Sequence, residues 1–277
     1  IVVDFTEEHL KMTKDPKHGY GKNMNPCIDC HAMMLNYAGK MLEEYGASFL
    51  ITGEVLNQRP MSQNKKSLDI VKKESGFEDK ILRPLCALNL PPTKMEIDGL
   101  VDRSKLLGIS GKSRKQQIEL ARQWGIKDYP SPAGGCMLTE PQFANRLRDL
   151  YSHDKEAVEP MDIKLLRIGR HMRISPSTRL VCTRNESEYE PLMELLKDEY
   201  LIFDTADCSG STVVLIPSKA GMLSDEDVLF AASVVARYSK EREKDSVRVK
   251  FKKKNDSEYE YMLVKPAEDE AIKKVLL

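Results

Sequence analysis

The chain lacks a long apolar segment and an excess of charge of one sign. No run among its 277 residues approaches the roughly 20 apolar residues needed to cross a bilayer. The 43 basic and 43 acidic side chains cancel, so any contact with nucleic acid must come from a local patch. No leader for export is visible. We therefore expect a cytoplasmic protein that makes no use of a membrane.

The sequence also lacks a regular cysteine framework. Its six cysteines stand at irregular spacing, which favours free or metal-binding thiols over disulfides. Cys27 and Cys30 form a C-x-x-C pair at the expected start of a helix, and Cys136 follows a glycine-rich stretch, residues 131–135. The partial positive charge of a helix N-terminus favours the thiolate, the form that attacks persulfides and binds metals. These three thiols predict either a metal site or a sulfur relay.

The residues alone leave these two interpretations open. Three thiolates can hold a [4Fe–4S] cluster with one iron free for substrate, and the same thiols without a cluster can carry a persulfide and resolve it as a disulfide. A zinc site would need a fourth ligand, such as His31 or Asp29. Haem attachment to the C-x-x-C-H stretch is disfavoured, because it needs export and an axial partner. Cys86 and Cys182 lie in apolar stretches and are expected in the core.

The hydropathy pattern divides the chain into two domains. Residues 1–152 alternate short apolar runs with amphipathic stretches, which is typical of an α/β domain. A polar linker is expected over residues 153–162. Residues 163–277 predict a smaller α+β domain with its own core. The first domain is expected to have strands at 1–5, 48–51 and 81–85, and helices at 34–45, 93–108, 113–125 and 139–151.

The second domain shows paired strands with two helices. Strands are expected at 164–174, 179–183, 201–203, 212–217, 246–252 and 259–264, and helices around 192–196 and at 225–238. Two helix starts carry specific signals. Thr93 and Glu96 have the spacing of a capping box in the first domain, and Ser224 is placed to cap the last helix of the second.

A run of basic side chains without an acidic residue opens the second domain. It contains Lys164, Arg167, Arg170, Arg173, Arg179 and Arg184. On a strand, Arg167 and Arg173 would share one face and Lys164 and Arg170 the other. We expect this run to bind RNA phosphates. A second basic cluster, residues 248–254, is neighboured by acidic residues, so simple solvation is an equal alternative for it.

The surroundings of the three thiols resemble the PP-loop tRNA thiolation enzymes. Residues 25–30, NPCIDC, are similar to the first-cysteine motif of the tRNA 2-thiouridylases, with Cys30 at the catalytic position. Residues 52–63 and 82–85 are similar to the 4-thiouridine synthetases, and Cys136 stands where these families have their second catalytic cysteine. The three-thiol arrangement, with Cys27 as the extra thiol, resembles the cluster-dependent tRNA thiolases.

This resemblance implies a parallel-sheet domain of the adenine nucleotide alpha hydrolase type and an ATP-dependent sulfurtransferase. ATP with Mg would adenylate a tRNA uridine, and sulfur from a persulfide-carrying desulfurase or free sulfide would replace the oxygen. Cys30 and Cys136 would be the catalytic thiols, with Cys27 as a resolving thiol or third metal ligand. The residues implied to line the nucleotide and substrate crevice beyond a strand are Glu54, Gln58 and Arg59.

The sequence departs from that family in one respect. The nucleotide-binding loop Ser-Gly-Gly-x-Asp-Ser occurs nowhere in it. Because the chain opens on an expected strand, we expect the domain to be incomplete at its N-terminus, with the loop in a missing segment.

Residues 163–277 resemble another unit, the RNA-binding domain of the NFACT proteins. The likeness rests on residues 167–174 and 181–186. It implies that tRNA is the partner and that the basic run, with His171, contacts it. Two other functions stay open: a non-catalytic RNA-binding protein with a structural metal site, and ATP-dependent sulfur transfer to a small molecule.

Overall fold

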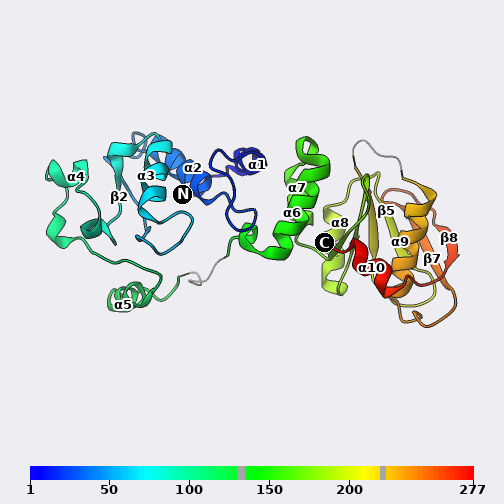
Figure 1. Cartoon of the computed structure of the whole chain (residues 1–277). Helices are drawn as coiled ribbons and strands as arrows, with labels where there is room; N and C mark the ends of the chain where they lie inside the picture. Colours follow the sequence, from blue (N-terminus) through cyan, green and yellow to red (C-terminus); the bar gives the residue numbers. More distant parts are fainter. Residues whose placement is uncertain (130–134, 219–222) are drawn as a thin grey trace. The chain divides into compact units, whose positions relative to one another are not determined.

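The chain forms two compact units, each with its own secondary structure (Figure 1). The computed structural model describes residues 1–129, 135–218 and 223–277. The units are Ile1–Thr139, here unit 1, and Glu140–Leu277, here unit 2. None of the helices in these ranges is long and apolar enough to cross a membrane.

Unit 1 consists mainly of helices and turns around a very small sheet. Strands β1 (Leu50–Ile51) and β2 (Ile81–Leu82) pair in parallel, with Leu50 opposite Ile81. This confirms a mixed α/β unit with a parallel sheet. Its helices are α1 (Thr6–Lys14), α2 (Cys27–Lys40), α3 (Lys65–Glu74), α4 (Lys94–Ile97) and α5 (Lys115–Gln123). Short 3-10 turns lie at η1 (Glu78–Lys80), η2 (Ala87–Asn89), η3 (Arg103–Lys105) and η4 (Met137–Thr139).

Two expectations for unit 1 were wrong. Residues 1–5 form no strand, and the side chains of Ile1 and Val2 are 84% and 98% exposed, whereas Phe5 is half-buried beside Tyr37. Helix α4 begins where predicted, and the Glu96 carboxylate accepts the Thr93 N–H at 2.7 Å, but the helix ends at Ile97. The reason is Gly99, whose φ of +73° lies in the left-handed region that terminates helices.

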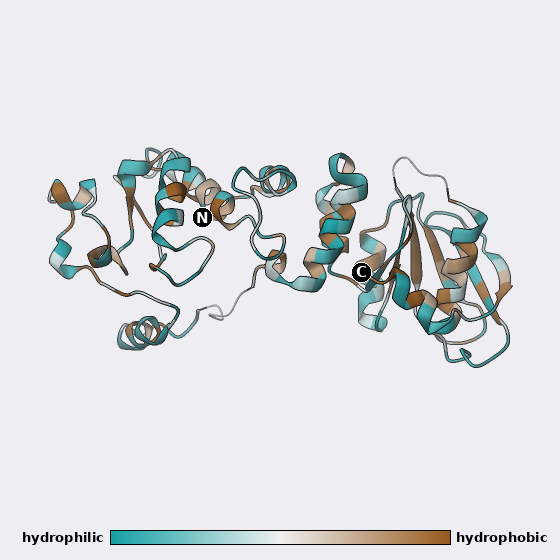
Figure 2. Ribbon diagram, in the orientation of Figure 1, coloured by the Kyte–Doolittle hydropathy of each residue, from teal (hydrophilic) through white to brown (hydrophobic). Residues whose placement is uncertain are grey.

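Unit 2 is built on one antiparallel sheet of six strands. The order is β3-β4-β6-β5-β7-β8. The strands are β3 (Arg170–Ser175), β4 (Thr178–Cys182), β5 (Leu201–Thr205), β6 (Val213–Pro217), β7 (Val247–Lys253) and β8 (Glu260–Val264). The helices are α6 (Pro141–Asp154), α7 (Pro160–Leu165), α8 (Tyr189–Glu194), α9 (Asp225–Arg237) and α10 (Asp269–Val275), with 3-10 turns η5 (Lys155–Ala157) and η6 (Glu186–Glu188). The inner strand β6 (VVLIP) is apolar, whereas the apolar residues of β3 and β7 are interspersed with charged ones (Figure 2).

The two faces of this sheet bury separate apolar clusters. On one face, α9 packs its alanines and valines against Phe203 and Phe251, whose rings stack with their centroids 5.1 Å apart. On the other face, Ile202 and its neighbours on β4 and β6 pack against Leu165 of α7 and Leu192 of α8. Helix α9 starts at the predicted cap, because the Ser224 hydroxyl accepts the Asp227 N–H at 3.1 Å.

The domain boundary lies earlier than the sequence pattern predicted. Helix α6 belongs to unit 2, where Asp149 pairs with Arg173 of β3 at 2.7 Å. The expected linker over 153–162 is occupied by the end of α6, by η5 and by the start of α7. Pro160 at the first turn and a capping box at Glu159 start α7, so Lys164 is helical and the strand expected from 164 begins only at Arg170.

Candidate active site

The first two thiols stand in the first turn of α2. The Cys30 N–H donates to the Pro26 carbonyl at 2.9 Å, which fixes the start of the helix. The Asn25 side-chain amide donates to Cys27 Sγ at 3.1 Å. Both thiols are half-buried, as expected for residues on a helix that packs against the body of unit 1.

Hydrogen bonds tie the segment after the third thiol to the residues that precede α2. The Met24 N–H donates to the Leu138 carbonyl at 3.2 Å, and the Asn23 amide donates to the Thr139 carbonyl, 116 residues further along. Cys136 lies just before these contacts and is exposed. The glycine-rich stretch quoted for this thiol begins outside the described residues, at 131–134.

Burial and nearby charges change the pKa of the Cys30 thiol. Burial, followed by the negative charges of Cys136, Cys27 and Asp29, raises the pKa of Cys30 to about 11. Cys30 is therefore a neutral thiol near pH 7, whereas its place at a helix start had predicted a thiolate. The same effect shows that the Cys136 sulfur lies within electrostatic reach of Cys30. Together with the hydrogen bonds from residues 23–24 to 138–139, this places Cys30 and Cys136 in the same region of unit 1.

A buried ion-pair network supports α2 directly behind the thiols. The Glu54 carboxylate accepts Arg83 Nε at 2.8 Å and contacts His31 Nδ1 at 3.0 Å. Burial raises the pKa of Glu54, but the hydrogen bond from His31 and the charge of Arg83 outweigh it and lower the pKa overall. Because His31 follows Cys30 in sequence, the network links the thiol helix to the segments after β1 and β2.

The three residues expected to line a crevice have separate roles. Gln58 and Arg59 line a cavity of about 400 Å³ together with Arg114 and Tyr129. Glu54 does not line it. Its carboxylate is buried and occupied by Arg83 and His31, so the crevice role predicted for Glu54 is replaced by a positioning role. From the sequence, His31 was considered only as a zinc ligand, and Arg83 only as part of a stretch that carries the family resemblance; their contacts with Glu54 were not predicted.

The three thiols were also predicted as metal ligands. Across residues 1–129, 135–218 and 223–277, no three His, Cys, Asp or Glu side chains are placed to hold a metal ion. The six cysteines are all free. Metal binding by Cys27, Cys30 and Cys136 stays a prediction.

The basic run predicted to contact RNA is dispersed in unit 2. Lys164 and Arg167 are exposed. Arg170 lies over the Tyr238 ring, 5.0 Å from its centroid, and Arg184 is exposed but donates to the Gly169 carbonyl at 2.6 Å. For these four residues, RNA contact stays a prediction.

The other three members of that set are engaged inside the protein. Arg173 is nearly buried against Asp149. Burial, followed by the charges of Arg146 and Arg179, lowers the pKa of His171 to about 3. His171 and Arg179 are 1% and 5% exposed. Both side chains are thus engaged inside unit 2, and RNA contact by either stays a prediction.

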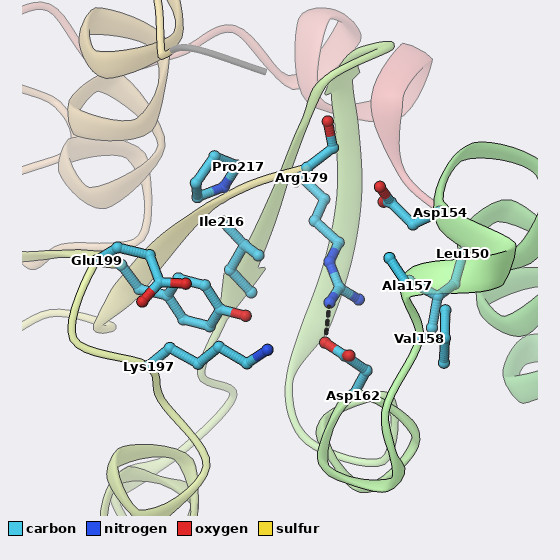
Figure 3. Close-up of a pocket in the computed structure, with 12 residues that line it drawn as sticks. Leu150, Asp154, Ala157, Val158, Asp162, Arg179, Lys197, Glu199, Ile216 and Pro217 are labelled. Carbon is cyan, nitrogen blue, oxygen red and sulfur yellow. Dashed lines mark hydrogen bonds and ion pairs between the residues drawn. The ribbon is translucent and has the colours of Figure 1, made fainter. Parts of the chain in front are cut away.

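Figure 3 shows how Arg179 is used instead. Its guanidinium donates to Asp162 at 2.9 Å within a cavity of about 300 Å³ in unit 2. Lys197 lies on the wall opposite Val158. The ion pair joins β4 to α7 and holds that helix on the sheet.

Two family models match the chain, one in each unit. Residues 1–101 match the thiamine biosynthesis protein (ThiI) family, which includes PP-loop sulfur-transfer enzymes, and residues 169–276 match the NFACT protein RNA binding domain. The first match suggests tRNA thiolation or a related sulfur transfer, and the second suggests RNA as a partner. Both resemblances predicted from the residues are thereby supported at the level of the family.

Other comparisons add little. No curated protein matches the chain significantly. Among solved structures, the C-terminal part of the fibronectin/fibrinogen-binding protein from Streptococcus suis is 13% identical. The match covers 98% of this chain and 95% of that one, with a TM-score of 0.36, and we infer nothing from so low a likeness.

Proposed function

We propose that this protein is a tRNA sulfurtransferase that replaces a uridine oxygen with sulfur through a thiol relay between Cys30 and Cys136. The single observation that carries the proposal is the approach of these thiols from segments more than a hundred residues apart. It occurs in the unit whose first 101 residues match a sulfur-transfer family. The RNA-binding family match of unit 2 supports tRNA as the substrate.

The relay uses one persulfide and one thiol. Cys30 carries the sulfur as a persulfide, and the outer sulfur bonds to the activated uridine carbon as the leaving group departs. The Cys136 thiolate then attacks Cys30 Sγ. The sulfur–sulfur bond breaks, its electron pair stays with the sulfur on the base, and a Cys30–Cys136 disulfide forms. An external dithiol reduces this disulfide before the next turnover.

Uridine activation by ATP with Mg, through an adenylated intermediate, belongs to the proposal on the strength of the family resemblance. The residues of this chain do not fit a pyrophosphate site of that family, because the Ser-Gly-Gly-x-Asp-Ser loop is absent from the sequence. We therefore derive no step through ATP. Gln58 and Arg59 are proposed substrate contacts because they line the 400 Å³ cavity.

A [4Fe–4S] cluster on Cys27, Cys30 and Cys136 is the alternative form of the same activity. The donor set suits iron, but the geometry described above does not hold three ligands around one metal. We therefore favour the relay form, in which Cys27 is a second thiol able to resolve the Cys30 persulfide in place of Cys136. Anaerobic purification followed by iron analysis separates the two, because the relay form predicts no stoichiometric iron.

The test is a single-turnover thiolation assay with the full-length protein. Unmodified tRNA, ATP with Mg and a desulfurase that donates persulfide sulfur are supplied without reductant. We expect thiolated tRNA and a Cys30–Cys136 disulfide, detected by mass spectrometry of the digested protein. Cys30→Ser and Cys136→Ser should each abolish product, and Cys208→Ser in unit 2 should not. Full activity in either of the first two variants would refute the relay.

A small molecule is the second candidate acceptor of the sulfur. It is favoured by the name of the matching family, which refers to thiamine biosynthesis. In this case the protein should fail to bind or thiolate tRNA while Cys30 still accepts persulfide sulfur, which mass spectrometry of the intact protein would reveal.

A further inference from the structure

The helices on one side of the unit 2 sheet leave its last two strands uncovered. Along β7, Val247, Val249 and Phe251 point into the core under α9. The alternate residues point to the opposite face, the one on which Ile202 packs against α7 and α8. Lys252 lies directly opposite Ile202 in the register, so this face continues from the helix-covered cluster onto β7 and β8.

This open face combines cations with exposed aromatic rings. Arg248 lies over the Tyr261 ring, with Cζ 4.5 Å from its centroid. Lys250 and Lys252 each place Nζ 4.9 Å from the centroid of Tyr259. The rings remain 53% exposed at Tyr261 and 38% at Tyr259. These five residues are named the open face below.

A groove adjoins the open face. It has a volume of about 1240 Å³ and is lined by Arg184, Tyr189 and Asp204, among others. Asp204 is the register partner of Lys250. Burial, followed by the charges of Asp204 and Tyr259, raises the pKa of Tyr189, so Tyr189 lies within reach of the open face. Tyr189 is itself 42% exposed and offers a further aromatic ring in the groove.

We propose that unit 2 binds unpaired RNA on the open face, with bases stacked on Tyr259 and Tyr261 and phosphates held by Arg248, Lys250 and Lys252. This proposal rests on the RNA-binding part of the proposed function and assigns it a surface. Charge complementarity favours a polyanion as the occupant, and flat exposed rings favour bases that are free to leave a stack. A duplex hides its bases, so it would use the cations alone.

Acidic neighbours limit the strength of the site without cancelling it. Asp207 lies 3.7 Å from Arg248, and Asp204 accepts the Thr212 hydroxyl at 2.6 Å. The carboxylate of Asp204 is therefore partly satisfied within the protein. The expected affinity is moderate and salt-dependent. With three cations on the strand, log K should fall with log salt at a slope of about −2.

The test is fluorescence anisotropy of a labelled short oligouridylate with the full chain. Tyr261→Ala should weaken binding about tenfold, because it removes one stacked base, whereas Tyr261→Phe should retain most of the affinity. Lys250→Ala should reduce the salt slope by about 0.7. Tyr45→Ala, at a tyrosine of matched exposure in unit 1, should change neither quantity. Circular dichroism of each variant confirms that the fold is intact.

The outcomes distinguish failure of the open-face proposal from failure of the RNA-binding function on which it rests. If the wild-type chain binds neither oligouridylate nor tRNA, the RNA-binding function fails. If it binds both but Tyr259→Ala, Tyr261→Ala and Lys250→Ala bind as tightly as wild type, RNA is bound elsewhere and the open-face proposal is overturned. It is also overturned if duplex RNA binds as tightly as the single strand with no loss in the tyrosine variants. Binding of an acidic protein in preference to RNA would overturn it as well.

Discussion

The two units differ in the size of their sheets and in the place of their buried charges. Unit 2 buries apolar residues on both faces of a six-stranded sheet. Unit 1 has a sheet of two strands, and its interior includes charged and amide side chains such as Glu54, Arg83 and Gln63. Apolar burial is non-directional and tolerates adjustment, whereas buried charges need each partner at a fixed place. Unit 2 buries an ion pair too, Arg179 with Asp162, but that pair holds a helix on the large sheet, whereas the Glu54–Arg83 pair of unit 1 lies next to the thiol helix.

The largest expected effect comes from breaking the buried network of unit 1. Arg83→Met removes the only guanidinium that pairs with the buried Glu54 carboxylate among the described residues. The carboxylate keeps His31 and Thr52 as partners, and unit 1 should be destabilised by about 3 kcal/mol. Hydrogen exchange measured by mass spectrometry should show faster exchange in unit 1 and unchanged exchange in unit 2. Arg122→Met, which removes an exposed pair with Glu119, is the control and should have almost no effect. Equal effects of the two variants would show that the buried pair contributes no more to unit 1 than an exposed pair does.

Adding a Cβ at a glycine with a positive φ tests the close packing of unit 2. Gly169 has a φ of +70°, and a Cβ there would lie 2.5 Å from the Cys182 carbonyl oxygen. Gly169→Ala should therefore cost about 3 kcal/mol, from left-handed strain and steric overlap together. Gly125 in unit 1 has nearly the same φ, +69°, with open space around it, so Gly125→Ala should cost only about 1 kcal/mol. Urea unfolding gives both values, and a smaller cost at Gly169 would contradict the predicted overlap.

Acid should weaken unit 2 through one buried histidine. The pKa of His171 is lowered from 6.5 to about 3, so the folded state stays neutral there while the unfolded state binds a proton below about pH 6.5. Stability is full above that pH and falls as pH decreases toward 3, with a loss of about 2 kcal/mol between pH 7 and pH 5. Urea midpoints followed across this range measure it. His171→Gln should flatten the dependence, and an equally steep slope in that variant would contradict the assignment.

The smallest expected effects compare helix caps in the two units. Ser224→Ala removes the hydroxyl that caps α9 and should cost about 1 kcal/mol. Thr93→Ala removes the hydroxyl donor to Glu96 at a helix of only four residues, so about 0.5 kcal/mol is expected. Thermal melts of the two variants provide the measurement. A larger loss at Thr93 would show that α4 matters more to unit 1 than its length indicates.

The sequence predicted the strands of unit 2 better than the elements of unit 1. From β5 to β8, each expected strand matches the observed one within a few residues, because neighbouring side chains alternate between two buried or half-buried faces. Unit 1 has too little strand for such a signal. The apolar residues 1–5 resembled a strand although Ile1 and Val2 face solvent, and α4 ended at a glycine inside an otherwise helical pattern.

The candidate sites were predictable only where local sequence carries the signal. Cys27 and Cys30 share one helical turn, and the approach of Cys136 followed from the family resemblance and not from spacing. The basic run could not be divided into exposed and paired side chains from sequence, because a linear run of arginines does not show which carboxylates pair with it. Asp149 of α6 pairs with Arg173, and Asp162 of α7 pairs with Arg179. The tyrosines of the open face became visible only once β8 was paired with β7.

The hydrogen bonds that join residues 23–24 to 138–139 have a consequence for the order of folding. They close a loop of 116 residues. Forming them in an unfolded chain therefore costs more conformational entropy than forming a local contact. Contacts of such high sequence separation form late in folding. Cys136 therefore approaches Cys27 and Cys30 only after the intervening segments have folded. In a partly folded chain, Cys136 stays separated from the other two thiols.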